Sequence, residues 1–129
     1  MEKIGIIGLG NMGMGIAKNV IKDGYATMGY DLRKECLEEI VSHGGEAAES
    51  VSQIGDLCGV VFVMVMNGDQ VKEVVTKLSP GLKDRGTIII TATITPEEVR
   101  EAYSIAKKSN IKMVDSPVSG GLDGAHDGT

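Results

Sequence analysis

Apolar segments of strand length alternate along the chain with segments whose apolar residues repeat at helical spacing. This alternation is typical of a parallel sheet joined by crossover helices. The pattern predicts strands at residues 3–7, 26–30, 60–66, 87–90 and 111–114, with a brief edge strand at 46–49. It predicts helices at residues 12–23, 34–42, 50–56 and 70–78, and a last one from Thr95 to about Ser109. We therefore predict an α/β fold with a doubly wound parallel sheet in three layers, helices on both faces.

Residues that cap or terminate helices mark several of these boundaries. Gly24 is expected to end the first helix in the left-handed conformation that glycine adopts without strain. Pro80-Gly81 is expected to end the helix at 70–78, because proline lacks a backbone donor and glycine favours helix ends. Thr95-Pro96-Glu97-Glu98 places a capping hydroxyl, a proline and two acids at the start of the last helix, as the helix dipole favours.

The hydrophobic pattern also predicts which faces are buried. The segment 60–66 is apolar on both faces, which a strand tolerates only where both sides of the sheet are covered, so this strand should lie centrally. The helix at 34–42 should turn three residues inward: Leu37, Ile40 and Val41. Four residues at the spacing of one helix face make the inner side of the helix at 70–78: Val71, Val74, Val75 and Leu78.

The length, the net charge and the apolar runs of the chain argue against several classes of partner. A chain of 129 residues predicts one domain, residues 1–129. Its formal net charge of −5 repels a phosphate backbone, so no nucleic-acid partner is expected. The longest uninterrupted apolar run is 60–66, far below the roughly 20 residues of a membrane-spanning helix. The first ten residues lack the basic start and continuous apolar stretch of a signal peptide, so no membrane association is expected either.

The cysteines and histidines indicate neither a disulfide framework nor a metal site. Cys36 and Cys58 form no CxxC pair, and reduced thiols in a cytoplasmic protein are the simplest interpretation. His43 follows a predicted helix and His126 lies in a glycine-rich tail, neither with a second ligand at metal spacing. We therefore expect no bound metal.

The strongest chemical motif is the glycine-rich segment Gly8-Leu9-Gly10-Asn11-Met12-Gly13. It fits GxGxxG, follows a predicted strand and opens a predicted helix, which is the context that makes this motif bind a dinucleotide in Rossmann-type folds. Gly8 would allow the sharp turn, Gly10 would let backbone amides approach a pyrophosphate, and Gly13 would let the helix lie close to the sheet. The alternative is that the glycines serve only a tight strand-to-helix turn.

Asp31 follows the second predicted strand, 18 residues after Gly13. An acid at this place accepts hydrogen bonds from the ribose hydroxyls of NAD and repels the 2′-phosphate of NADP, so we predict NAD as cofactor and NADP as less favoured. Arg33 and Lys34 nearby leave some tolerance for a phosphate. The alternative for Asp31 is an acid that caps the next helix, and the two roles are compatible.

Residues 115–129 form a glycine-rich tail without helical or strand periodicity. Its start, Asp115-Ser116-Pro117-Val118-Ser119-Gly120-Gly121, places a hydroxyl beside two glycines and would expose amides to a carboxylate. An ordinary turn is an equal interpretation of this segment taken alone.

Together these motifs resemble the β-hydroxyacid dehydrogenases, the family of 3-hydroxyisobutyrate dehydrogenase and tartronate semialdehyde reductase. GLGNMGMGIAKNV at 8–20 is similar to the family's cofactor signature, and DSPVSGGLDGAHDGT at 115–129 is similar to its substrate signature. Between them, Ala92-Thr93-Ile94-Thr95-Pro96 is similar to the family's S-T-I-x-P segment, with Ala92 in place of the usual serine. The resemblance covers the whole chain.

The resemblance implies hydride transfer between a nicotinamide and a short 3-hydroxy acid or its semialdehyde. It implies that residues 8–12 hold the diphosphate, that Met66 and Asn67 line the nucleotide, and that Thr93 lies near the nicotinamide. A substrate carboxylate would bind at Ser119, Gly120 and Gly121.

The family's catalytic lysine lies in a G-x-x-G-x-x-x-K-x-x-N segment further along, and we expect no catalytic residue within residues 1–129. The mainly helical C-terminal domain that closes the active site and makes a homo-oligomer in the family likewise has no counterpart here. We interpret the chain as the cofactor-binding domain of such an enzyme, inactive alone. The alternatives are a stand-alone NAD(P)-binding regulatory module without catalysis and, less favoured, another Rossmann-fold protein such as a methyltransferase.

Overall fold

The computed structural model describes residues 3–64, 67–91 and 94–115. The strands are β1 (Ile4–Ile7), β2 (Thr27–Tyr30), β3 (Glu46–Ala47), β4 (Val60–Val63), β5 (Thr87–Ile90) and β6 (Lys112–Asp115). The helices are α1 (Asn11–Lys22), α2 (Lys34–Ser42), α3 (Val51–Leu57), α4 (Gly68–Leu82) and α5 (Pro96–Lys108). Strands and helices alternate strictly along the described chain, as the sequence predicts.

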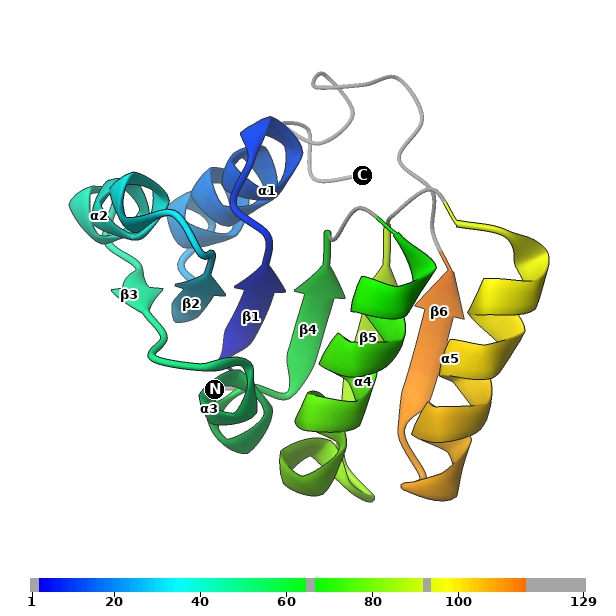
Figure 1. Cartoon of the computed structure of the whole chain (residues 1–129). Helices are drawn as coiled ribbons and strands as arrows, with labels where there is room; N and C mark the ends of the chain where they lie inside the picture. The colour runs from blue at the N-terminus through cyan, green and yellow to red at the C-terminus, as the bar shows by residue number, and fades with distance from the viewer. Residues whose placement is uncertain (1–2, 65–66, 92–93, 116–129) are drawn as a thin grey trace.

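The strands form one parallel sheet in the order β3-β2-β1-β4-β5-β6 (Figure 1). The chain runs outward from β1 to β3, crosses over through α3, and then runs outward again from β4 to β6. This is the doubly wound arrangement, and β4 lies centrally between β1 and β5, as predicted. Because all strands run the same way, their carboxyl ends meet at one edge of the sheet, where ligands of such folds bind.

Helices cover both faces of the sheet, so the predicted three-layer α/β fold is confirmed. One hydrophobic cluster joins α3, α4 and α5 to the sheet and includes Ile7. The other joins α1 and α2 to the opposite face and includes Ile6. Consecutive residues of β1 therefore point into different cores, as the period-2 geometry of a strand requires.

Helix α4 differs from the prediction, because it continues through Pro80-Gly81 and ends at Leu82. Pro80 lies on the exposed side of the helix, where water can reach the carbonyl that its missing N–H leaves without a partner. Leu82 is fully buried, and the packing of this last turn outweighs the local helix-breaking tendency.

The end of α4 lies directly against α3. A Cβ added to Gly81 would overlap the backbone of Gly55 and Asp56, so the two helices approach at backbone distance. The Arg85 guanidinium lies over the same contact, donating to the carbonyl oxygens of Gly55 at 2.8 Å and Asp56 at 3.1 Å. Its Nε also donates to the Gly81 carbonyl at 3.0 Å, which ties the ends of both helices together.

Helix α2 matches its predicted bounds but not its whole predicted inner face. Ile40 is fully buried and Leu37 packs partly against the α1 cluster. Val41 is 52% exposed, contrary to the expectation that it faces inward. Val41 follows the buried Ile40, and successive side chains point about 100° apart around a helix axis. The Val41 side chain therefore points away from the sheet.

Candidate functional site

The turn between β1 and α1 is built on Gly8 and Gly13. Gly8 has a φ of +96°, and an added Cβ would lie 2.7 Å from the Met64 carbonyl oxygen at the end of β4. An added Cβ at Gly13 would overlap the Gly8 carbonyl oxygen, so only glycine lets the helix begin this close to the turn. The conformational roles predicted for these two glycines are confirmed, since both positions exclude a side chain.

Gly10 plays a different part, because none of residues 3–64, 67–91 and 94–115 crowds it. It is the N-cap of α1, with an extended backbone and no side-chain capping bond. Within the described part of the chain, an added Cβ would meet only the Arg33 Nη2 atom, at 3.6 Å. The space in front of Gly10 is therefore open at the start of α1, where the first backbone N–H groups of a helix lack intrahelical acceptors and the helix dipole attracts anions.

Asp31 follows β2 directly and is held against the glycine turn. The Leu9 amide donates to its Oδ2 at 2.7 Å, and the Arg33 amide donates to its Oδ1 at 2.9 Å. The Arg33 side chain completes the arrangement, with Nε donating to Oδ1 at 3.0 Å and Nη2 donating to Oδ2 at 3.1 Å. The Asp31 side chain is 9% exposed, so the carboxylate is nearly enclosed by these donors.

These donors fix the charge of Asp31. The hydrogen bonds from the Arg33 side chain are the main cause that lowers the pKa of the Asp31 carboxyl to about 2, and the two backbone amides add to it, whereas burial acts in the opposite direction. Asp31 is therefore a carboxylate at neutral pH. Asp31 is not the N-cap of α2, the alternative that the sequence left open: the N-cap is Arg33, and Asp31, two positions earlier in the chain, accepts the amide of that residue.

Asn67 follows β4 at the same edge of the sheet, but its side chain has a structural task. Its Oδ1 accepts the Gln70 amide at 2.9 Å, and the Gln70 side chain reaches back to the Asn67 amide, which makes a capping box at the start of α4. The predicted contact of Asn67 with a nucleotide stays a prediction. Met66, Thr93, Ser119, Gly120 and Gly121 lie outside the described residues.

Thr95 caps α5, as the sequence predicted, and Glu98 completes a capping box. Thr95 accepts the Glu98 amide at 3.2 Å, and the Glu98 carboxylate accepts the Thr95 amide at 2.9 Å. That bond is the main cause that lowers the pKa of the Glu98 carboxyl. The same carboxylate fills the space beside Gly68, where an added Cβ would overlap it. Glu98 thus joins the starts of α4 and α5, a role that sequence reasoning did not identify.

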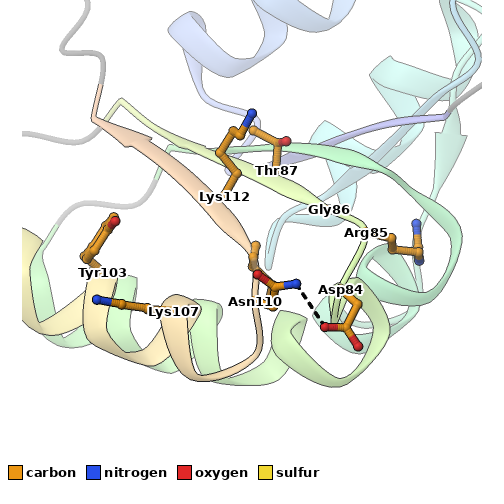
Figure 2. Close-up of a pocket in the computed structure, with 9 residues that line it drawn as sticks. Asp84, Arg85, Gly86, Thr87, Tyr103, Lys107, Asn110 and Lys112 are labelled. Carbon is orange, nitrogen blue, oxygen red and sulfur yellow. Dashed lines mark hydrogen bonds between the residues drawn. The ribbon is translucent and has the colours of Figure 1, made fainter.

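A separate pocket of about 450 Å³ lies at the opposite edge of the sheet (Figure 2). It is lined by the amino ends of β5 and β6 and by α5, from which Tyr103 and Lys107 extend. The Asn110 side chain donates to Asp84 at 3.1 Å beside it. None of the residues 8–13 lines this pocket. It is therefore distinct from the glycine turn.

Other features of the described residues add no chemistry to this site. Residues 3–64, 67–91 and 94–115 contain no group of three His, Cys, Asp or Glu side chains placed to hold a metal. Both cysteines are free, and burial raises the pKa of the fully buried Cys58 thiol to about 11, so that it stays protonated. Within the same residues, no helix has the length and apolar character needed to cross a membrane.

The comparison with known families decides what kind of domain this is. A family model described as the NAD binding domain of 6-phosphogluconate dehydrogenase matches residues 3–129. The chain belongs to this family. Membership places the glycine turn and Asp31 in an NAD-binding domain, and it agrees with the doubly wound fold.

Relatives and solved structures of this NAD-binding family confirm the resemblance to hydroxyacid dehydrogenases. A probable mitochondrial 3-hydroxyisobutyrate dehydrogenase of Dictyostelium discoideum is 36% identical, over 99% of this chain and 41% of that protein. The NAD-dependent L-serine dehydrogenase of Pseudomonas aeruginosa is 31% identical, over 100% of this chain and 44% of that protein. Mycobacterium tuberculosis 3-hydroxyisobutyrate dehydrogenase, solved with L-serine, is 28% identical with a TM-score of 0.92, covering 98% of this chain and 44% of that one. The chain spans less than half the length of these relatives.

Proposed function

We propose that this chain is the cofactor-binding part of an NAD-dependent oxidoreductase that interconverts a short 3-hydroxy acid and its semialdehyde. The observation that carries the proposal is the Asp31 carboxylate, tied by the Leu9 amide to the rim of an open glycine turn. The names of the relatives support the substrate class, since 3-hydroxyisobutyrate and L-serine are both short 3-hydroxy acids.

In this proposal each part of the site has one task. The diphosphate would lie over Gly10 against the first-turn amides of α1, and Asp31 would accept hydrogen bonds from the adenosine ribose. When bound, the nicotinamide supplies the acceptor for the hydride. Met66, Asn67 and Thr93 beside the nucleotide, and Ser119, Gly120 and Gly121 beside a substrate carboxylate, remain predictions from the family resemblance.

The charge of Asp31 supports NAD over NADP. A carboxyl with a pKa of about 2 is ionised at neutral pH and opposes the 2′-phosphate that distinguishes NADP. Arg33 partly offsets this repulsion from its place beside the carboxylate. We therefore expect a preference for NAD rather than complete exclusion of NADP.

Calorimetric titration of the chain with NADH and with NADPH tests this proposal. We expect saturable binding with NADH preferred. Gly10→Ala should weaken NADH binding by about tenfold or more, because a methyl group would occupy the space through which the diphosphate approaches the amides. The same change should leave the unfolding temperature nearly unchanged, since among the described residues the new Cβ would meet one atom, at an ordinary contact distance of 3.6 Å.

The outcomes of this titration separate the parts of the proposal. Unchanged NADH binding by Gly10→Ala would contradict the placement of the diphosphate. Preference for NADPH would contradict the role of Asp31 as a selector. If neither cofactor bound, the proposal that residues 1–129 hold a dinucleotide would be contradicted.

We also propose that residues 1–129 act as one dinucleotide-binding domain that holds no catalytic residue of its own. Mixed with NAD and either 3-hydroxyisobutyrate or L-serine, the chain should produce no NADH above the enzyme-free rate, measured by absorbance at the nicotinamide band. Substrate-dependent NADH formation would show that the chemistry needs nothing beyond these residues.

The remaining parts of the proposal concern the whole protein. The family resemblance supports a homo-oligomer for a protein that also carries the helical domain. The protonated, buried Cys58 is compatible with a reducing cytoplasmic location.

A further inference from the structure

The Arg33 side chain covers the carboxylate that the proposed function assigns to the ribose. A carboxylate offers about four acceptor positions, and here all four are taken. Two are filled by the backbone amides of Leu9 and Arg33, and two by Nε and Nη2 of the Arg33 guanidinium. A ribose diol needs two of these positions, so it cannot bind Asp31 while all four donors stay in place.

The two pairs of donors differ in how readily they can leave. The backbone donors belong to the glycine turn and to the start of α2, so their loss would move the main chain. The guanidinium belongs to a side chain that is 55% exposed, and its rotation requires no change in the backbone. Only the guanidinium end of this ion pair is exposed to water, so the hydroxyls of a ligand can take its place on Asp31 from the solvent side.

The guanidinium also lies between the two parts of the site. Its Nη2 is 3.1 Å from Asp31 Oδ2 and 3.6 Å from the Cβ position of Gly10. It therefore extends from the ribose-binding carboxylate toward the open space at the start of α1. A dinucleotide that passes from Asp31 to Gly10 would meet the guanidinium along its path.

We infer that Arg33 is a latch on the cofactor site: in the free chain its guanidinium competes with the ribose for Asp31, and a dinucleotide must displace it. This inference rests on the proposed function and deepens it. Displacement lowers the affinity for NAD, because the ion pair is lost when the ribose binds. For NADP the released guanidinium recovers a partner, since it can pair with the 2′-phosphate. Arg33 is thus a specificity-determining residue that acts against NAD and in favour of NADP.

The test compares three variants by calorimetric titration with NADH and NADPH. Arg33→Ala should lower the Kd for NADH by about threefold, the scale of an exposed ion pair, and raise the Kd for NADPH by about tenfold. Arg33→Lys keeps the charge but not the two-pronged pairing, so it should also bind NADH more tightly while keeping NADPH affinity within about threefold of the original. Lys34→Ala is the matched control, because it removes an adjacent exposed positive charge from the same helix start.

The opposite signs for the two cofactors distinguish a latch from a structural role. Damage to the fold would weaken both cofactors together, and the unfolding temperature of each variant checks this directly. NADH affinity that is unchanged or weaker in both Arg33 variants would overturn the latch, while NADH binding by the original chain would leave the proposed function standing. Equal effects of Lys34→Ala and Arg33→Ala would also overturn it, because the loss of any positive charge near the start of α2 would then explain the change in affinity. An original chain that binds neither cofactor would overturn both.

Discussion

Gly13→Ala is expected to destabilise the chain by at least about 3 kcal/mol. The added methyl group would overlap the Gly8 carbonyl oxygen, which is backbone and cannot rotate away as a side chain would. Helix α1 would have to move off the glycine turn, which separates it from the sheet. Since small domains are stable by only about 5–15 kcal/mol, we expect the unfolding temperature to fall on the order of 10 °C or more. Thermal unfolding followed by circular dichroism measures this.

Gly10→Ala is the matched control for this substitution. It adds the same methyl group three residues earlier in the same turn, where the nearest neighbour among the described residues would be a side-chain atom of Arg33 at 3.6 Å. It should therefore unfold close to the temperature of the original chain. An unfolding temperature for Gly13→Ala within about 2 °C of that of Gly10→Ala would show that the turn tolerates a side chain at both positions.

Gly81→Ala should destabilise the chain by a comparable amount, about 3 kcal/mol. Alanine is the better helix former by about 1 kcal/mol, so propensity alone predicts the opposite sign. The structure predicts destabilisation because the new Cβ would overlap the Gly55 and Asp56 backbone, forcing α4 away from α3. Urea unfolding at constant temperature gives the free energy difference directly.

Pro80→Ala provides the control for this helix end. Pro80 is the neighbouring residue of the same helix, but it lies on the exposed side, so its replacement should leave the free energy of unfolding unchanged or raise it, because alanine restores the missing N–H donor. Stabilisation by Gly81→Ala would contradict the backbone-to-backbone contact between α3 and α4. Equal destabilisation by both substitutions would place the effect in the helix end itself rather than in its contact with α3.

The parts of the fold that the sequence predicts are those set by local chemistry. Gly24 ends α1 with a φ of +94°, and Thr95 with Glu98 caps α5, because these residues act through their own backbone and immediate neighbours. The alternation of apolar strands and amphipathic helices likewise predicts the doubly wound sheet. The glycine turn is partly local, since Gly13 excludes a side chain through its contact with the nearby Gly8 carbonyl.

The parts that were predicted wrongly or missed depend on contacts between distant segments. Pro80-Gly81 is a local signal for a helix end, but the buried Leu82 and the contact with Gly55 keep the helix going. The sequence placed Arg33 near a phosphate and did not predict its ion pair with Asp31. An Asp and an Arg two residues apart indicate an ion pair only if the turn between β2 and α2 brings both side chains to the same side, which the sequence pattern does not show.

The position of β1 in the sheet has a consequence for the order of folding. β1 precedes the other strands of the sheet in the chain, but its Ile4 pairs with Val60, so β1 acquires its second neighbour only after β2, β3 and α3 have been made. The glycine turn needs that neighbour, because the Met64 carbonyl that closes over Gly8 follows β4. Contacts this distant in sequence form slowly. The glycine turn is therefore completed by a segment that follows it by more than fifty residues, and it depends on long-range strand pairing.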